Sequence, residues 1–169
     1  PAFKVASFEI VDLPLIKYIA RKQKPILMST GMASLEEIGD AIEAAKSIGN
    51  DDILLFHCIS SYPAPLPEAN LNMIQILQKE FNIQVGLSDH TIGNLASVLA
   101  TSMGAAAIEK HFTLNRSDGG VDSSFSLEPE EMKSLVKETK EAFSALGPTS
   151  FARSSVEEGN KVFRRSLYF

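Results

Sequence analysis

The chain contains 169 residues, 44% of them hydrophobic and 22% charged, and its formal net charge is −5. This length allows one ordinary domain with a buried core, and the acidic balance excludes nucleic acid as a general partner. No apolar run reaches the ~18–20 residues of a membrane-spanning helix, so we expect no membrane partner. The single cysteine, Cys58, excludes an intrachain disulfide and is typical of a cytoplasmic protein.

Five short apolar runs predict five β-strands. The runs are Phe3–Phe8, Pro25–Ser29, Ile53–Cys58, Ile83–Leu87 and Ala106–Phe112. They are continuous rather than alternating, which is typical of parallel strands covered on both faces. Helical patterns follow them at residues 12–22, 34–49, 70–81, 92–104 and 128–147. Ser34 and Glu37 form a capping-box signature at the start of the second helix, and Gly147 marks the end of the last one.

The alternation of one strand with one helix predicts an α/β fold with a parallel sheet. Polar residues follow all five strands. A doubly wound sheet gathers ligands mostly at one switch point, whereas a (β/α)8 barrel builds its active site from the carboxyl ends of all its strands. We therefore expect residues 1–147 to be the later part of a (β/α)8 TIM barrel whose opening strands lie outside this sequence. The pattern changes after Gly147, so we expect residues 148–169 to be a linker and the beginning of another domain.

Two of the three histidines, His90 and His111, stand where consecutive predicted strands end. Their side chains can therefore converge at one rim of the sheet. Two neutral imidazoles, together with water or a carboxylate, make an open site for a divalent transition metal. The alternative is that one histidine caps a loop and the other packs against Phe112.

Strand-end hydroxyls and one lysine predict an anion site. Ser7, Ser29 and Ser88 end three different strands, where hydroxyls and backbone N–H groups can bind a phosphate or a carboxylate. Lys4 lies within an apolar strand and needs an anionic partner to offset its desolvation. The alternative for each serine alone is that it satisfies the backbone of its own loop.

Two acidic residues and one tyrosine complete the candidate site. Glu9 follows Ser7 by two positions, so both side chains point to the same side while the strand persists. Asp122 lies in a glycine-containing loop after the last strand, where a lid or a sugar-binding loop is expected, although it could instead be a turn former. Tyr62, which precedes Pro63, is expected to form a wall of the pocket.

Five segments in this order resemble the sialic acid synthase family of nonulosonate synthases. They read KVASFEI, PILMSTGMASLEEI, HCISSYPAP, VGLSDHT and AAIEKHFTLNRSDGGVDSSFSLEP, and they look most like the pseudaminic acid branch. The resemblance implies a (β/α)8 barrel that condenses phosphoenolpyruvate with a six-carbon acetamido-sugar. The products are a nine-carbon nonulosonic acid and phosphate. It also implies a homodimer and a C-terminal SAF (antifreeze-like) domain, of which FRRSLYF would be the hinge and first strand.

Residue roles follow from the matching motif positions. The resemblance implies that His90 and His111 bind Mn²⁺ or, alternatively, Mg²⁺ or Co²⁺. The residues implied to contact phosphoenolpyruvate or the sugar are Lys4, Ser7, Ser29, Ser88 and Tyr62, with Glu9 and Asp122 in catalytic roles. The implied activity is therefore that of a metal-dependent transferase that forms a carbon–carbon bond.

Other readings of the same residues stay open. An N-acetylneuraminate synthase or another phosphoenolpyruvate-condensing barrel enzyme of the aldolase type would share the rim chemistry but not the acceptor sugar. An enzyme that uses Lys110 as a Schiff-base lysine belongs with these alternatives. A non-catalytic fragment with a degenerate site is a third class.

Overall fold

In the computed structural model, residues 1–164 are described. The strands are β1 (Phe3–Val5), β2 (Ile26–Ser29), β3 (Ile53–His57), β4 (Val85–Asp89) and β5 (Ile108–Lys110). The α-helices are α1 (Leu13–Ala20), α2 (Leu35–Lys46), α3 (Met73–Phe81), α4 (Leu95–Ser102) and α5 (Pro129–Leu146). The 3-10 helices are η1 (Ser7–Glu9), η2 (Leu66–Glu68), η3 (Arg116–Asp118), η4 (Ser123–Phe125) and η5 (Ser155–Phe163). The predicted alternation of strands and helices is confirmed.

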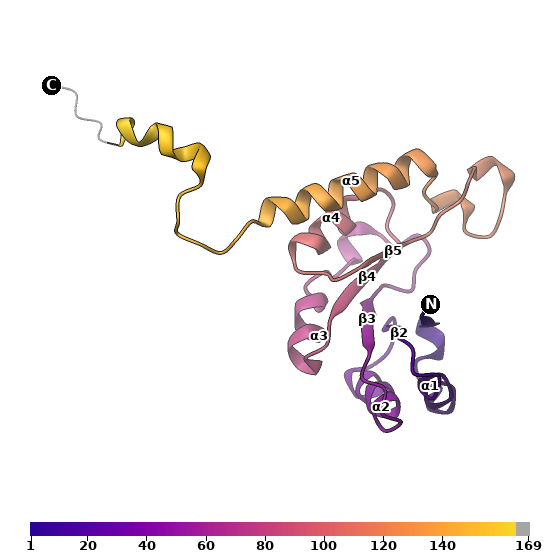
Figure 1. Ribbon diagram of the computed structural model, residues 1–169. Helices are drawn as coiled ribbons and strands as arrows, with labels where there is room; N and C mark the ends of the chain where they lie inside the picture. Colours follow the sequence, from indigo (N-terminus) through magenta and orange to yellow (C-terminus); the bar gives the residue numbers. More distant parts are fainter. Residues whose placement is uncertain (165–169) are drawn as a thin grey trace.

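The five strands form one parallel sheet in the order β1-β2-β3-β4-β5. Each strand pairs with the next along the chain, from Phe3 opposite Ile26 to Asp89 opposite Lys110. This sequential order has no switch point, so the sheet is not doubly wound. The helices α1 to α4 cover one side of the sheet, and α5 lies across α4 (Figure 1).

The sheet is strongly curled. In a flat sheet, β1 and β5 would lie about 19 Å apart, four spacings of roughly 4.8 Å, which is too far for their side chains to meet. Yet Lys4 Nζ on β1 lies 3.4 Å from Glu109 Oε1 on β5. This contact crosses the concave side of the sheet. The five units therefore form a half-barrel, which confirms that the chain is part of a (β/α)8 barrel.

The convex side of the sheet carries the hydrophobic core. Because side chains alternate along a strand, one set from each strand packs on α1 to α4. The buried strand residues in this core are Val5, Ile26, Met28, Ile53, Leu55, Val85 and Leu87. The intervening side chains face the concave side, where polar groups such as Lys4, Ser29 and Ser88 lie among apolar ones such as Phe56.

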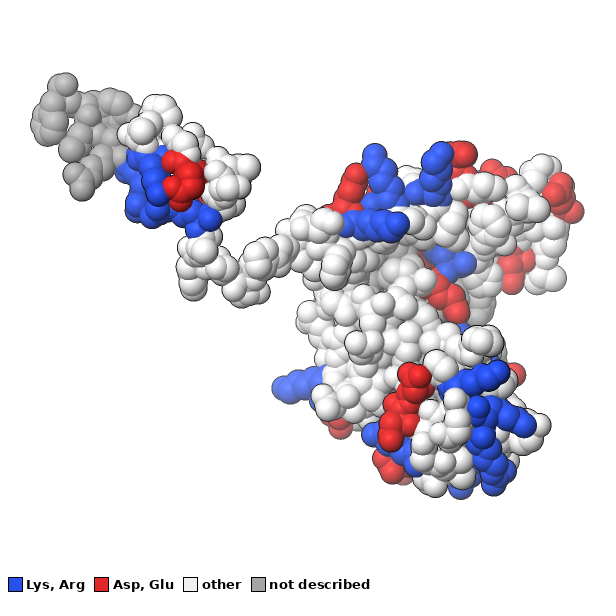
Figure 2. Space-filling model, viewed as in Figure 1, with Lys and Arg blue, Asp and Glu red and all other residues white. Residues whose placement is uncertain are grey.

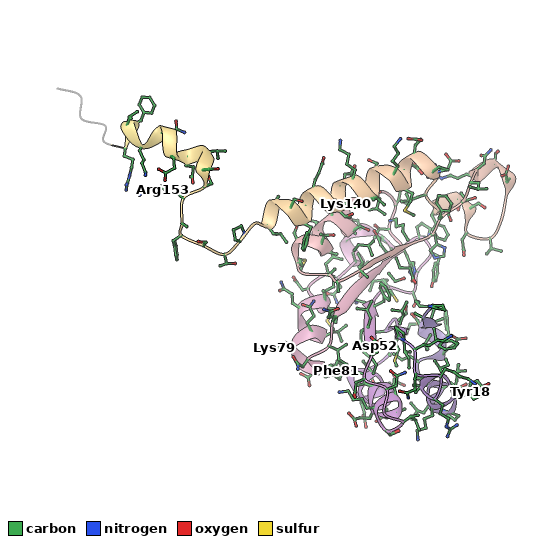
Figure 3. All side chains as sticks on the ribbon, in the orientation of Figure 1. Tyr18, Asp52, Lys79, Phe81, Lys140 and Arg153 are labelled. Atoms are coloured by element: carbon green, nitrogen blue, oxygen red, sulfur yellow. The ribbon has the colours of Figure 1, made fainter. Side chains whose placement is uncertain are left out.

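The helix ends confirm the signals in the sequence. Glu37 N–H donates to Ser34 Oγ at 3.2 Å, while Ser34 N–H donates to the Glu37 carboxylate at 2.8 Å, which completes the expected capping box. Gly147 ends α5 with a φ of 57°, a conformation that suits glycine. The outward faces of α1 and α3 carry exposed side chains such as Tyr18 and Lys79 (Figure 3).

The predicted bounds of three strands are wrong by two residues or more, and those of β2 and β3 by one residue. The first strand stops at Val5 because Ser7–Glu9 turns into the 3-10 helix η1. The fourth strand runs two residues further than its apolar run, to Asp89, since its polar side chains find partners on β5. The fifth is shorter than predicted and ends at Lys110. Apolar runs report burial, whereas strand limits depend on which backbone groups find a neighbouring strand.

Beyond Gly147 the chain leaves the half-barrel, and the last element among the described residues is η5 (Figure 1). None of residues 148–164 is buried. The proposed linker and SAF assignment for residues 148–169 stays a prediction, and the expected SAF strand in SLYF lies outside the described residues.

Acidic and basic side chains both lie over α1, α2 and α5 on the visible face (Figure 2). Among residues 1–164 no helix has the length and hydropathy needed to cross a bilayer.

His57 on the convex side predicts a pH dependence of stability. Burial lowers the pKa of His57 below its usual 6.5, against the opposing effect of its hydrogen bond with the Ala69 carbonyl at 2.9 Å. As pH falls below 6.5, the unfolded chain therefore gains a proton before the folded one, and the free energy of unfolding decreases. The variant His57→Gln keeps an amide donor for Ala69 but cannot titrate.

We expect the stability advantage of the parent protein over His57→Gln to be constant above about pH 7 and to shrink between about pH 6.5 and 5. Urea unfolding of both proteins at a series of pH values measures this difference. The titration of His90 is common to both proteins and cancels. Parallel stability curves over this range would contradict the assignment.

Candidate active site

A continuous polar network crosses the concave side of the half-barrel. Lys4 Nζ donates to Ser29 Oγ at 2.7 Å and pairs with Glu109 at 3.4 Å. Ser88 Oγ donates to Glu109 Oε1 at 2.7 Å and lies 3.2 Å from His90 Nε2. Three of the predicted anion-binding residues, Lys4, Ser29 and Ser88, are thus joined to a predicted metal ligand through Glu109.

His90 is oriented by a backbone carbonyl. Its Nδ1 lies 2.8 Å from the Ile59 oxygen, which can only accept, so Nδ1 carries the proton and Nε2 presents a lone pair. Burial lowers the pKa of His90, the Ile59 contact opposes this, and neighbouring His111 lowers the pKa further. The ring is therefore neutral at physiological pH. A carbonyl behind one nitrogen and a free lone pair on the other is the usual arrangement of a metal-binding histidine.

His111 lies beside His90, with ring centroids 5.3 Å apart. Its Nδ1 is 3.5 Å from Asp122 Oδ2, a carboxylate from the loop after β5. Tyr62 stacks on His90 at 4.3 Å, and Phe125 meets the edge of His111 at 5.1 Å. Two segments distant in sequence, the loop after β3 and the loop after β5, therefore converge on the two imidazoles, which lie side by side as predicted.

These residues fit the donor chemistry of a divalent metal site. Each histidine has an oxygen acceptor near Nδ1, the Ile59 carbonyl for His90 and the Asp122 carboxylate for His111, which leaves Nε2 available for a metal. Ser88 gives its one proton to Glu109, so its oxygen also presents lone pairs towards His90. Within residues 1–164, however, no three His, Cys, Asp or Glu side chains are arranged as a metal cage. The two histidines would therefore need water or substrate as further ligands.

A second cluster lies at the ends of β1, β2 and β3. Ser7 Oγ lies 3.1 Å from Cys58 Sγ, and Ser60 Oγ is buried without a hydrogen-bond partner. A Cβ on Gly31 would lie 2.8 Å from Ser7 Oγ and 2.9 Å from Cys58 Sγ and would also collide with Ser60 Oγ. Any side chain at this position would therefore force the Ser7, Cys58 and Ser60 side chains to move. An unpartnered buried hydroxyl is a group that a bound ligand or water can satisfy.

Glu9 does not join either cluster. Its carboxylate accepts the Ala6 N–H at 2.8 Å and caps η1. The expectation that Glu9 and Ser7 point to the same side is wrong, because β1 ends at Val5 and the strand alternation stops there. Ser7 is buried, whereas Glu9 is exposed. The catalytic role of Glu9 stays a prediction.

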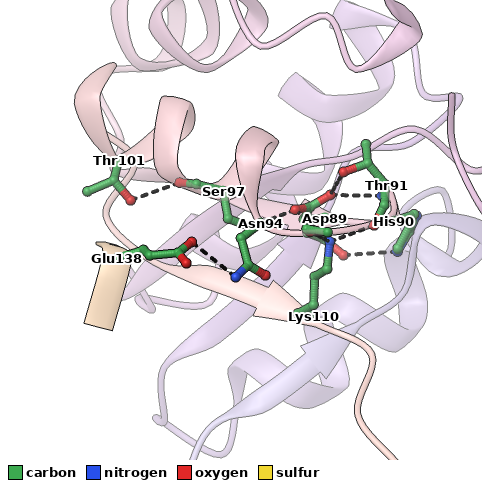
Figure 4. A network of polar contacts seen from close by, with 10 residues as sticks. Asp89, His90, Thr91, Asn94, Ser97, Thr101, Lys110 and Glu138 are labelled. Carbon is green, nitrogen blue, oxygen red and sulfur yellow. Dashed lines mark hydrogen bonds and ion pairs between the residues drawn. The ribbon is translucent and has the colours of Figure 1, made fainter. Parts of the chain in front are cut away.

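Lys110 is engaged on the convex side of the sheet (Figure 4). Its ammonium group donates to Asp89 Oδ2 at 2.9 Å, to the Thr91 carbonyl at 2.6 Å and to the Gly93 carbonyl at 2.7 Å. All three protons have acceptors, and only 2% of the side chain is exposed. Lys110 therefore has no free amine on the concave side, and it cannot serve there as the nucleophile that a Schiff-base mechanism needs.

The loop that carries Asp122 is anchored at its base. Thr113 N–H donates to the Leu127 carbonyl, and Leu127 N–H donates to the His111 carbonyl, both at 2.9 Å. Arg116 pairs with Glu128 and Glu131 at the start of α5. The loop therefore leaves and rejoins the half-barrel at fixed points, with Asp122 and Phe125 directed to the histidines.

Three participants in the site were not predicted from the sequence. Glu109 connects Lys4 to Ser88, Gly31 packs against the second cluster, and Phe125 borders His111. The signal for Glu109 was available, because two-residue alternation in the segment IEKH places Glu109 and His111 on one face and Lys110 on the other. No local pattern identifies Phe125 or Gly31, since their partners are distant in the sequence.

The fold and the polar groups at its strand ends define half of a (β/α)8 barrel with an active-site rim of the kind found in enzymes. More specifically, the NeuB family model matches residues 1–150, and the chain belongs to the NeuB family. Curated relatives and solved structures agree with this assignment.

The pseudaminic acid synthase of Helicobacter pylori is 45% identical over 169 residues, covering 99% of this chain and 50% of that protein. The N,N'-diacetyllegionaminic acid synthase of Campylobacter jejuni is 42% identical, covering 98% of this chain and 50% of that protein. A crystal structure of the sialic acid synthetase of Leptospira borgpetersenii superposes with a TM-score of 0.88 at 35% identity, over 98% of this chain and 58% of that one. The chain thus spans about half the length of the curated relatives it matches.

The tight packing at Gly31 predicts that a single methyl group destabilises this end of the barrel. In Gly31→Ala, the new Cβ must displace Ser60, Ser7 or Cys58, which costs about 1–3 kcal/mol of unfolding free energy. The matched control is Gly39→Ala on α2, where the nearest atom, on Phe81, would be 3.7 Å away. We expect the control to be neutral or stabilising by up to about 1 kcal/mol. Equal stability of the two variants in urea unfolding would contradict the packing argument.

Proposed function

We propose that this chain is part of a nonulosonate synthase that condenses phosphoenolpyruvate with a six-carbon acetamido-sugar. The product would be a nine-carbon acid of the pseudaminic type, with release of phosphate. The observation that carries the proposal is the network from Ser29 through Lys4, Glu109 and Ser88 to His90, within a NeuB-family half-barrel. The relation to the Helicobacter pylori pseudaminic acid synthase supports the choice of sugar.

In this proposal Lys4, Ser29 and Ser88, with Ser7 at the neighbouring strand end, bind the phosphate and carboxylate of phosphoenolpyruvate. Lys4 is suited to this role because its side chain is 35% exposed and pairs with a Glu109 carboxylate that is 41% exposed. A partly solvated ion pair can exchange one anion for another without leaving a charge buried.

His90 and His111 would hold the divalent metal, Mn²⁺ or alternatively Mg²⁺ or Co²⁺. When bound, such an ion supplies a Lewis acid for the carbonyl oxygen of the open-chain sugar. His90 contributes a neutral ring whose direction is set by the Ile59 carbonyl. Tyr62 packs against that ring and excludes water from one side of it.

The carbon–carbon bond forms when C3 of phosphoenolpyruvate attacks the sugar aldehyde. Water then adds at C2, and phosphate leaves by cleavage of the C2–O bond. Glu9 and Asp122 are the proposed catalytic acids and bases. Burial, together with nearby Cys58, Asp122 and Glu109, raises the pKa of Tyr62, so its phenol remains a hydrogen-bond donor to a sugar oxygen at neutral pH.

Phosphate release by the full-length protein tests the proposed reaction. Phosphoenolpyruvate and Mn²⁺ are supplied with diacetamido-trideoxy-altrose in one reaction and N-acetylmannosamine in another, each with and without EDTA. We expect EDTA-sensitive release with the first sugar only. Release with the second sugar only would overturn the pseudaminic assignment in favour of an N-acetylneuraminate synthase. No release with either sugar would contradict the proposed function.

Histidine variants test the metal assignment within the same assay. His90→Gln and His111→Gln are expected to lower kcat/KM by at least about a hundredfold, because each removes a ligand of the proposed Lewis acid. His57→Gln is the matched control, since His57 is buried on the convex side and bonds only the Ala69 carbonyl. Equal activity of the His90 and His57 variants would exclude the metal assignment.

A further inference from the structure

One ion pair behind the candidate site differs from all the others in the described part of the chain. Asp89 Oδ2 and Lys110 Nζ lie 2.9 Å apart, with side-chain exposures of 0% and 2%. Every other ion pair among residues 1–164 has side chains that are at least 30% exposed. A buried ion pair stabilises a fold poorly compared with apolar residues of the same volume. Its presence therefore points to a role other than stability.

The hydrogen-bonding capacity of this pair is fully used (Figure 4). Asp89 accepts the N–H and O–H groups of Thr91, both at 2.8 Å, and the Ser97 hydroxyl at 2.6 Å, in addition to Lys110. The two remaining protons of Lys110 go to the carbonyl oxygens of Thr91 and Gly93. Charge-assisted bonds of this kind are strong and directional. They bind the segment after β4 to β5 and α4.

The anchored segment in turn anchors the loop after β3. Thr91 bridges to Ala64, and Ala64 N–H donates to the His90 carbonyl at 2.9 Å. The same loop supplies the Ile59 carbonyl for His90 Nδ1 and the Tyr62 ring that stacks on His90. The ion pair therefore fixes two loops at once, residues 59–64 and 90–93.

The ion pair is also linked to His111, the second proposed metal ligand, through the backbone. Lys110 directly precedes His111, so anchoring its side chain on the convex side fixes the backbone from which His111 projects to the other side. From the neighbouring strand β5, Lys110 donates hydrogen bonds to Asp89 and Thr91, the two residues that flank His90. This contact therefore adds to the backbone pairing of β4 with β5 and to the Ser88–Glu109 hydrogen bond in setting the distance between the two imidazoles.

We propose that Asp89 and Lys110 are positioning residues that set the placement of loops 59–64 and 90–93, and through it the affinity of His90 and His111 for a divalent metal. The consequence for metal affinity rests on the proposed function. The placement of the loops does not, since it follows from the hydrogen bonds alone.

The test uses the double variant Asp89→Asn/Lys110→Met in the full-length protein. Removing Lys110 alone would leave a buried carboxylate without its countercharge and would destabilise the protein. The double variant removes both charges, keeps the side-chain volumes and retains an acceptor for Thr91, so we expect it to fold. It still lacks the donor for the Thr91 and Gly93 carbonyls.

The matched control is Asn50→Ala. Asn50 is 3% exposed, and its amide donates to the carbonyls of Ala20 and Lys24 at 3.3 and 3.0 Å. It precedes β3 at the other end of the sheet from the candidate site. This variant therefore loses a buried hydrogen-bond network without touching loops 59–64 or 90–93.

Three quantities are measured for each protein: the melting temperature, the Kd for Mn²⁺ by titration calorimetry, and hydrogen exchange of the two loops without metal. We expect the double variant to weaken Mn²⁺ binding by about tenfold or more, as loss of outer-shell support does, with faster exchange in both loops. Asn50→Ala should lower the melting temperature and change the Kd by less than about twofold, because distant sites act independently.

Unchanged exchange in both loops of the double variant would overturn the positioning role. Unchanged Kd despite faster exchange would overturn its consequence for metal affinity. Failure of the parent protein to bind Mn²⁺ would instead contradict the proposed metal site, and the exchange data would still decide whether the pair positions the loops.

Discussion

The two-residue alternation of β4 and β5 is the constraint on which the site depends. It places Asp89 and Lys110 on the convex side, where both side chains are buried as they pair, and Ser88 and Glu109 on the concave side, where they face Lys4. One pair of adjacent strands therefore carries a fully buried contact on the convex side and a partly buried polar contact on the side of the candidate site. A shift of one residue in the register would exchange these two roles.

Placing charged side chains on the concave side costs desolvation free energy, and the ion pair and hydrogen bonds of the polar network offset this cost. A lysine inside a sheet needs an anionic neighbour, and Glu109 provides it across the curl of the sheet. Both side chains remain partly exposed, so the pair stays adaptable in a way that Asp89 and Lys110 are not. Lys4 can therefore bind a ligand, whereas Lys110 holds the backbone of the segment after β4 in place.

The site could be anticipated in part because strand ends of a parallel sheet meet at one rim. The sequence predicted the pairing of His90 with His111, the lysine that needs an anion, and the loop that carries Asp122. It misplaced Glu9, because a strand pattern does not reveal where a 3-10 helix replaces the strand. It also left Lys110 as a possible nucleophile, although the two-residue alternation of IEKH already places Lys110 on the face opposite His111.

The sequence by itself determined the order of strands and helices, the helix caps and the residue types at each strand end. These depend on local periodicity and on hydrogen bonds within a few residues of each other. Only the tertiary structure decided that Glu109 is the centre of the polar network, that Ser60 is buried without a partner and that Lys110 is enclosed. Each of these depends on contacts between residues at least 17 positions apart, and the pairing and curvature of the sheet bring them together in a way that no local pattern encodes.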